Sequence, residues 1–346
     1  MNNNRTGILF VCESVGSLTI AHRMATQYKF DCPLYLFTLE NLLQHNVHLV
    51  DAFDYLTTEP YTLPGTLSKI KLVLFGAHES SPHCRLSNAI GFLVKKTRTA
   101  HASLQHGWIQ PGLNFETSTK RLDYRGFETD NSKSLVHFSD VLSFFGERGV
   151  GYPYPNERNL HEDSRSKILI ATNFNWGIYK ASEIKEFLEA VKLTRETYPG
   201  ADIVHRPHPA EKKEQIQIDW QEIYEDYNVK CTRDIPKYRD LSWPSLVIST
   251  PSTIALDYVT SGTPTIFYTP KIFDEFIKAL SFENQSFTTP EQLGSILNYQ
   301  QIKNPCKILR FPSPYFAEKI SALIENNQEF ELSEEVFFRF GEFLRQ

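Results

Sequence analysis

The sequence predicts an α/β protein with two doubly wound parallel sheets, because short apolar segments of strand length alternate with segments of helix length in both halves of the chain. The length of 346 residues is long for one domain and comfortable for two. Hydrophobic residues make up 41% of the chain and aromatic residues 13%, which is enough to build a core in each domain. We therefore expect an N-terminal domain over residues 1–150 and a C-terminal domain over residues 160–330.

The first domain is predicted from the alternation of strands and helices that begins after Gly7. A polar stretch rich in Gly and Asp, residues 110–134, follows as a loop that covers a site or grips a second substrate, and residues 139–146 return to strand-like character. The predicted elements, in chain order, are the strand 8–12, the helix 18–28, the strand 34–37, the helix 39–46, the strand 70–76, the helix 87–96 and the strand 99–104.

A boundary between the domains is expected at residues 149–158, where two glycines and two prolines interrupt any regular element. The C-terminal residues 331–346 indicate an amphipathic helix that docks on the other domain or touches a membrane surface, and docking is the simpler interpretation. The predicted elements of the second domain are the strand 167–172, the helix 182–197, a strand around Ile203, a helix near 216–227 and the strand, helix and strand of 247–268.

Charge and cysteine usage exclude several classes of protein. A net charge of −5 argues against a dedicated nucleic-acid binder, which is normally basic. The five cysteines are scattered and never spaced as CxxC, which indicates reduced thiols rather than disulfides or a zinc site. The sequence has no signal peptide and no apolar run of about 20 residues that would span a membrane. We therefore expect a cytoplasmic protein whose membrane contact, if it makes one, is peripheral at the inner face of the plasma membrane.

The segment 247–268 is the most informative part of the chain, because it places hydroxyl side chains between a strand and a helix. The helix is predicted to end at Gly262. The N–H groups and the dipole at the start of such a helix favour an anion, and the hydroxyls add neutral donors. The alternative is ordinary helix capping without a ligand. The hydroxyl residues are Ser249, Thr250, Ser252 and Thr253.

A second motif supports a phosphate site. Residues 201–209 indicate a short strand that runs into a rigid turn, with Arg206 and His208 at its carboxyl end. Ligands of open α/β sheets bind at this end of the strands. The polar pair Thr172 and Asn173 ends another predicted strand and is a candidate for contact with the donor base or ribose, although ordinary loop polarity explains it equally well. The two motifs together favour a nucleotide phosphate site.

The two predicted Rossmann-like halves, with the phosphate-binding motifs His208-Pro209 and 249–253 in the second, resemble the GT-B glycosyltransferases, whose two domains face across a cleft. The pair is similar to the HP and S/ST motifs of bacterial sialyltransferases and related capsule-building transferases that use CMP-sugars. Residues 248–268 also resemble the CDP-glycerol glycerophosphotransferases of teichoic acid synthesis. Both resemblances imply that the imidazole of His208 contacts the donor phosphate. They further imply that paired hydroxyls hold it, namely those of Ser249, Ser252 and Thr253.

The general base is less well defined. The acidic motif that carries the base in the sialyltransferases is not found, whereas His106-Gly107 resembles the His-Gly of the glycerophosphotransferases, where this His is a proposed base. His106 follows a predicted strand, and an imidazole titrates near neutrality. Glu79 and Glu13 follow other strands and are alternative bases, or each of the three is a loop residue that caps a neighbouring helix.

From these features we expect a glycosyltransferase that moves a CMP-activated acidic sugar, such as sialic acid or Kdo, to a glycan or glycolipid acceptor: a bacterial surface polysaccharide or lipopolysaccharide. Arg206, His208 and helix N–H groups would neutralise the phosphate, and the sequence has no metal-binding pattern, so neither a metal nor a cofactor is expected. The alternatives are a CDP-glycerol or CDP-ribitol phosphotransferase, a non-catalytic nucleotide-sugar binding protein and a nucleotide-sugar epimerase of the same architecture. No nucleic-acid partner is expected.

Overall fold

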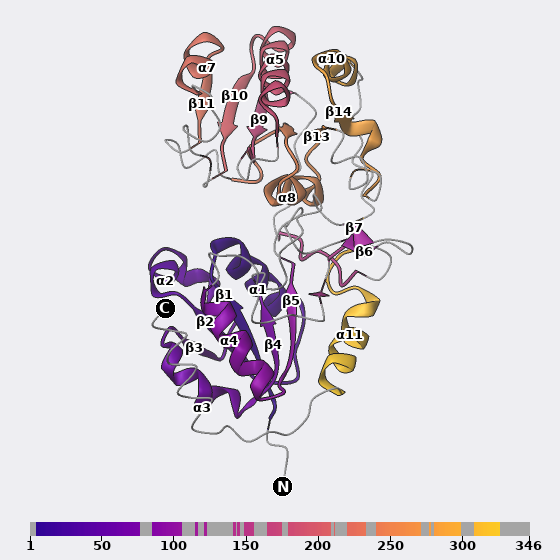
Figure 1. Cartoon of the computed structure of the whole chain (residues 1–346). Helices are drawn as coiled ribbons and strands as arrows, with labels where there is room; N and C mark the ends of the chain where they lie inside the picture. The colour runs from indigo at the N-terminus through magenta and orange to yellow at the C-terminus, as the bar shows by residue number, and fades with distance from the viewer. Residues whose placement is uncertain are drawn as a thin grey trace. The chain divides into compact units, whose positions relative to one another are not determined.

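In the computed structural model of this protein (Figure 1), the chain divides into two compact units. Unit 1 contains the N-terminal part up to Pro153 together with the chain from Leu309 onward, and unit 2 runs from Tyr154 to Ile308. The structure describes residues 5–76, 85–105, 115–116, 121–122, 141–142, 144–145, 149–155, 165–174, 179–208, 211, 220–232, 240–270, 277, 280, 281–298 and 308–325.

Unit 1 is built on a six-stranded sheet with the order β3-β2-β1-β4-β5-β8, in which every neighbouring pair is parallel. The side chains of β1 are all buried, as expected for a central strand covered on both faces. The strands are β1 (Gly7–Cys12), β2 (Leu34–Thr38), β3 (Tyr55–Thr57), β4 (Ile70–Phe75), β5 (Ala100–Leu104) and β8 (Val141–Leu142). The helices are α1 (Val15–Gln27), α2 (Glu40–Asn46), α3 (Leu63–Leu67), α4 (Arg85–Lys96) and α11 (Pro314–Glu325), with short 3-10 turns at Val47–Leu49 and Pro60–Thr62.

The core of unit 1 joins the central strands to the helices α3 and α4. Val11, Val73 and Phe75 from the strands pack with Leu93 from α4, and all four are fully buried. Their burial removes apolar surface from water, which is the main favourable contribution to folding. Two further short strands, β6 (Phe115–Glu116) and β7 (Arg121–Leu122), pair antiparallel. They lie within the stretch that the sequence predicted to be a loop.

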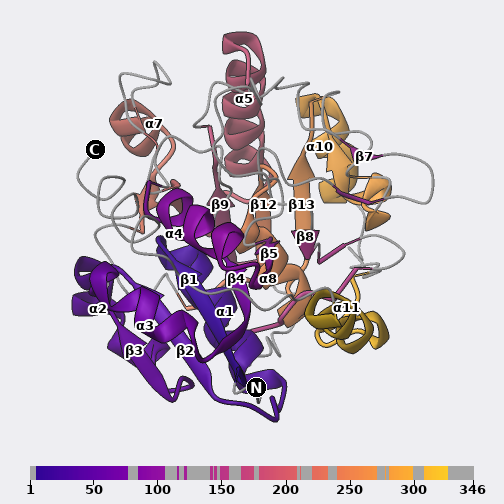
Figure 2. The ribbon, with the colours of Figure 1, turned by 60° about the horizontal axis from the view of Figure 1, so that its bottom comes forward.

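Unit 2 repeats the same architecture, with the parallel strand order β11-β10-β9-β12-β13-β14. Leu169, Val204 and Val247 from its central strands pack against Tyr258 from a helix to form the core. The strands are β9 (Lys167–Ala171), β10 (Asp202–Arg206), β11 (Val229–Cys231), β12 (Leu246–Ser249), β13 (Thr265–Tyr268) and β14 (Ser286–Phe287). The helices are α5 (Ala181–Thr197), α7 (Trp220–Asp226), α8 (Thr253–Ser261) and α10 (Pro290–Asn298), with a 3-10 turn at Glu283–Gln285. α5 and α10 lie side by side (Figure 2).

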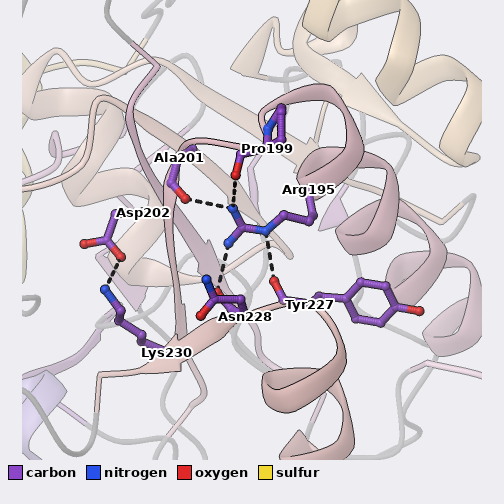
Figure 3. Close-up of polar contacts among 7 residues, drawn as sticks. All are labelled: Arg195, Pro199, Ala201, Asp202, Tyr227, Asn228 and Lys230. Carbon is purple, nitrogen blue, oxygen red and sulfur yellow. Dashed lines mark hydrogen bonds and ion pairs between the residues drawn. The ribbon is translucent and has the colours of Figure 1, made fainter.

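The side chain of Arg195 connects the amino ends of β10 and β11. The guanidinium of Arg195, at the end of α5, donates hydrogen bonds of 2.8 to 3.1 Å to four main-chain carbonyl oxygens (Figure 3). Beside it, Lys230 of β11 pairs with Asp202 of β10 at 2.7 Å. Because Asp202 starts β10, this cluster marks the amino end of the sheet, and its arginine has a structural role. The four carbonyl groups belong to Pro199, Ala201, Tyr227 and Asn228.

The structure corrects the predicted end of the second domain, because the chain returns to unit 1 at Leu309 rather than after residue 330. Tyr152 N–H donates to the carbonyl of Leu309 at 2.8 Å, and Phe311 N–H donates back to Tyr152 at 2.9 Å. Gly151, with φ of +90°, makes this approach possible, since a Cβ there would lie 2.7 Å from the carbonyl oxygen of Arg310.

Aromatic packing explains why α11 belongs to unit 1. Phe316 of α11 and the preceding Phe311 are buried, and both pack edge-on against Tyr28, which follows α1. Phe30 completes the cluster with a centroid distance of 6.1 Å to Phe316. The expected helix at 331–346 lies outside the described residues. Among the described helices, none is long and apolar enough to cross a membrane.

Candidate donor-phosphate site

The sheet register of unit 2 brings the predicted polar residues to one edge. Arg206 at the end of β10 pairs with Ala171 at the end of β9, and Ser249 at the end of β12 pairs with the same Ala171 from the other side. The three strand ends therefore form one row. Thr172 and Asn173 continue from the middle strand, and the turns that follow Arg206 and Ser249 flank them.

Helix α8 starts at this row. Ser252 is its N-cap, with extended backbone angles, and its hydroxyl accepts the N–H of Ala255 at 3.4 Å. Thr253 is the first helical residue and is partly exposed. The helix ends at Gly262, which adopts the left-handed conformation with φ of 96°, as predicted. An α-helix of this length presents its dipole and its first N–H groups at the Ser252 end.

The hydroxyls of Ser249 and Thr250 differ in their surroundings. Ser249 is fully buried, and its hydroxyl lies 3.1 Å from the carbonyl oxygen of Ala171 and 2.6 Å from that of Thr250. Its single proton is therefore used within the fold, whereas the resemblance implied a phosphate contact. The Thr250 hydroxyl is also fully buried, and it has no hydrogen-bond partner within the described parts of the chain. A buried polar atom without a partner is costly, so this hydroxyl is a candidate for contact with a ligand.

Two basic side chains lie at the neighbouring strand end. Arg206 is partly buried. It lies close to Tyr258 of α8: burial raises the pKa of Tyr258, and the positive charge of Arg206 partly opposes that rise. His208 is also partly buried, and burial lowers the pKa of its imidazole below the ordinary value of 6.5. At neutral pH His208 is therefore an uncharged imidazole, which offers one N–H to an anion, while Arg206 supplies the positive charge.

The two residues that follow β9, Thr172 and Asn173, differ in their hydrogen bonding. The hydroxyl of Thr172 lies 3.0 Å from Glu211 Oε2 and 2.8 Å from His205 Nε2, so it is engaged within the protein. The Asn173 side-chain oxygen is buried and has no partner among the described residues. Asn173 is thus the better candidate of the two for contact with a ligand.

His205 and Glu211 are buried polar residues of this region that the sequence analysis missed. His205 is 1% exposed and Glu211 is 7% exposed. Glu211 belongs to the charged run Glu211-Lys-Lys-Glu214, which has the composition of a solvated surface segment. His205 lies inside a short strand. The one available signal was that a polar residue at a central position of a buried strand needs a partner.

In unit 1 the carboxylate of Glu13 caps a helix. Its oxygens accept the N–H groups of Leu86 at 3.3 Å and Ser87 at 3.0 Å, and the Ser87 hydroxyl also donates to it. These donors belong to the first turn of α4. Burial raises the pKa of Glu13, and the hydrogen bonds from Ser87 and Leu86 oppose that rise. The geometry matches the capping alternative for this residue.

The two other candidate bases, His106 and Glu79, lie outside the described residues. At the end of β5, the Gln105 side-chain oxygen accepts the N–H of Phe144 at 2.9 Å. The hydroxyl of Ser103 on the same strand is buried without a partner in the part of the chain that the structure describes. The described residues contain no group of three or more His, Cys, Asp or Glu side chains with the geometry of a metal site.

Comparison with known proteins supports the fold. No protein-family model matches the sequence, and no curated protein matches it either. The structure is similar to UDP-GlcNAc 2-epimerase from Neisseria meningitidis bound to UDP-GlcNAc, with a TM-score of 0.52, 12% identity and coverage of 92% of this chain and 100% of that chain. It is also similar to MnaA of S. aureus in a co-structure with UDP, with a TM-score of 0.53, 10% identity and coverage of 92% and 96%. At this identity the likenesses show the fold alone, and they confirm the predicted pair of Rossmann-like α/β domains of the GT-B class.

Proposed function

We propose that this chain is a glycosyltransferase whose unit 2 binds the phosphate of a nucleotide-sugar donor at the start of α8. The observation that carries the proposal is the buried, unpartnered hydroxyl of Thr250, two residues before the N-cap Ser252. The register places the cationic Arg206 in the same row. A helix start, a free hydroxyl and a guanidinium at one edge are the groups that recognise a phosphate.

In the proposed reaction, an acceptor hydroxyl attacks the anomeric carbon of the sugar, and the bond from that carbon to the phosphate oxygen breaks. Negative charge develops on the departing phosphate, where Arg206, the N–H of His208 and the first N–H groups of α8 stabilise it. A base in unit 1 takes the proton of the acceptor hydroxyl, and His106 and Glu79 are the candidates. Glu13 is a weaker candidate, since its oxygens already accept hydrogen bonds from the first turn of α4.

The donor in this proposal is a CMP-activated acidic sugar such as sialic acid or Kdo, and the acceptor is a bacterial surface polysaccharide or lipopolysaccharide. The support is the similarity of His208-Pro209 and residues 249–253 to the HP and S/ST motifs. A CDP-glycerol or CDP-ribitol phosphotransferase would use the same phosphate site. It differs in the bond broken, which lies between two phosphates instead of between sugar and phosphate.

A second candidate function is nucleotide-sugar epimerisation, because the protein with a TM-score of 0.52 is a UDP-GlcNAc 2-epimerase. The two activities differ in their need for an acceptor. A transferase consumes its donor in proportion to acceptor and releases free nucleotide, whereas an epimerase converts the donor to its epimer without one.

The test is a donor panel with CMP-, CDP- and UDP-linked substrates, each incubated with and without a bacterial glycan acceptor, with products identified by mass spectrometry. Acceptor-dependent release of CMP from a CMP-sugar, with the sugar attached to the acceptor, supports the proposal. Release of CMP from CDP-glycerol or CDP-ribitol, with glycerol phosphate or ribitol phosphate attached to the acceptor, supports the phosphotransferase. Conversion of UDP-GlcNAc to an isomer without acceptor would replace the transferase by the epimerase. Thermal shift with CMP, CDP, UDP, GDP and ADP ranks the nucleotides independently, since a ligand that binds the native state raises its stability.

A further inference from the structure

A chain of buried polar side chains connects the carboxyl ends of β9 and β10. Oε1 of Glu211 accepts the N–H of Phe174 at 2.8 Å, and Oε2 accepts the hydroxyl of Thr172 at 3.0 Å. Thr172 Oγ1 also lies 2.8 Å from Nε2 of His205. His205 Nδ1 in turn lies 2.8 Å from the hydroxyl of Tyr224 on α7. The chain of contacts therefore runs from the loop after β9, through both strand ends, to a helix.

The carboxylate gives this chain of hydrogen bonds a direction. An ionised glutamate only accepts, so the Thr172 hydroxyl donates to Glu211 and accepts from His205. His205 therefore carries a proton on Nε2, and in its neutral form Nδ1 accepts from Tyr224. The indole ring of Trp220, with its centroid 3.9 Å from the His205 ring, packs against this imidazole. Thr172, His205 and Glu211 are buried, and each has a hydrogen-bond partner within the network, which is the condition for a polar network to rigidify a fold.

The same network fixes the turn that carries the basic residues of the candidate site. The N–H of Glu211 donates to the carbonyl oxygen of His208 at 2.9 Å. The N–H of Thr172 donates to the carbonyl oxygen of Arg206 at 3.2 Å. Between them, the ring of Pro207 restricts the backbone. The main chain on both sides of this proline is thus held to the end of β9.

We propose that Glu211 is a positioning residue, which acts through Thr172 and His205 to hold the turn of Arg206 and His208 against the start of α8. The inference rests on the proposed phosphate site, but it concerns residues that do not themselves bind the donor. The carboxylate oxygens of Glu211 face Thr172 and Phe174, so its effect on the donor passes through the backbone of the turn. A turn that is fixed before binding loses less entropy when the donor arrives.

The experiment compares Thr172→Val with Thr172→Ser. The valine removes the hydroxyl that joins Glu211 to His205 without changing any charge, and the serine retains it. CMP and UDP are the probes, with dissociation constants measured by calorimetry. We expect Thr172→Val to weaken binding of the better probe by about tenfold or more, and Thr172→Ser to restore it to within about threefold of the wild-type value. Glu225→Gln is the control, because Glu225 lies on the exposed surface of α7, where it accepts from Gln221.

A second readout does not depend on any ligand. The imidazole of His208 is titrated by NMR, with its signals assigned by their loss in His208→Gln. Release of the turn exposes His208 to water, so its lowered pKa should rise toward the ordinary value in Thr172→Val and stay low in Thr172→Ser. If wild-type protein binds neither CMP nor UDP, the proposed function fails, and this titration alone decides on the positioning role. A folded Thr172→Val protein with wild-type nucleotide affinity, or with an unchanged His208 pKa, overturns the inference.

Glu211→Gln keeps the proposal testable if Thr172→Val does not fold. With the amide oxygen on the N–H of Phe174, the amide nitrogen donates to Thr172, whose hydroxyl must then donate to His205. The proton of His205 is expected to move from Nε2 to Nδ1, which the ¹⁵N chemical shifts of the imidazole report. A shift of the tautomer together with weaker nucleotide binding supports the role. An unchanged tautomer in a folded protein contradicts the network.

Discussion

The two sheets of this chain have the same strand order, but their first strands end in side chains of different charge. The main-chain contacts define equivalent positions: Val11 accepts from the N–H of Gly76 at 2.8 Å, and Ala171 accepts from the N–H of Thr250 at 3.0 Å. Two residues after Val11 is Glu13, and two residues after Ala171 is Asn173. A carboxylate in unit 1 is thus equivalent to a neutral amide in unit 2.

This difference changes which groups of the protein lie at the start of the following helix. In unit 1 the carboxylate of Glu13 accepts from the first turn of α4, so the protein supplies its own anion to that helix start. In unit 2 the start of α8 receives the hydroxyl of Ser252, and the side-chain oxygen of Asn173 has no partner among the described residues. The same topology therefore gives one helix start whose N–H groups pair with a carboxylate of the protein, and one at which we propose that an external anion binds.

The largest effect on turnover is expected from removal of the general base, which the proposal assigns to unit 1. If unit 1 supplies the base, His106→Ala should lower turnover by roughly 10²- to 10⁴-fold, because this is the usual contribution of a positioned base. The dissociation constant of the donor should change little, since unit 2 binds it. Steady-state kinetics with a donor and an acceptor measure both quantities. Normal turnover in His106→Ala and its loss in Glu79→Gln would assign the base to the carboxylate.

The next effect tests the comparison itself, by moving the carboxylate of unit 1 into unit 2. Asn173→Glu places a negative charge where the donor phosphate is proposed to bind, and two anions close together repel. Nucleotide affinity should fall by about ten- to a hundredfold, which corresponds to about 1.4 to 2.8 kcal/mol. Asn173→Gln is the matched control, because it has the same length without the charge. Equal affinities of the two variants would place the phosphate away from the start of α8.

The sequence predicted most central elements because their signals are local. The buried strands β1, β4, β9 and β12 are apolar runs bounded by polar residues, and the left-handed Gly262 ends α8 as expected. The strands β3, β11 and β14 have two or three residues, too few to show an alternation, and were missed. The assignment of α11 to unit 1 depends on packing between distant aromatic residues, which no local pattern reveals.

For the candidate site too, the sequence predicted some features and missed others. Arg206 and Ser249 were expected to converge because the carboxyl ends of parallel strands meet at one edge, and the register confirms that they do. The roles of individual hydroxyls were not accessible, since Ser249 and Thr250 are adjacent and chemically similar. Only the three-dimensional contacts show that the Ser249 hydroxyl is hydrogen-bonded within the fold, whereas the Thr250 hydroxyl has no partner among the described residues. Glu211 was missed because a charged run indicates solvent unless the chain folds it back.

A smaller effect concerns the filled helix start of unit 1. Glu13→Ala leaves two N–H groups and the Ser87 hydroxyl without their acceptor, so the free energy of unfolding should fall by about 2 kcal/mol. Urea unfolding measures the change. Added phosphate should recover part of the loss in this variant and little in the wild type, because the vacated helix start then accepts an external anion. If phosphate restores none of the lost free energy of unfolding, the start of α4 does not bind an external anion.

The smallest effect is the pH dependence of the same contact. Burial raises the pKa of Glu13 in the folded state above its ordinary value of 4.5, so the native protein binds more protons than the unfolded chain between the two pKa values. The stability of the wild type should therefore fall as the pH rises through this window. Glu13→Gln removes the titration, so its stability relative to the wild type should increase from pH 4 to pH 7. Urea unfolding at each pH measures the difference, with Glu59→Gln as the control for an exposed carboxylate. A relative stability that falls with pH would mean that hydrogen bonding from α4, and not burial, dominates the ionisation of Glu13.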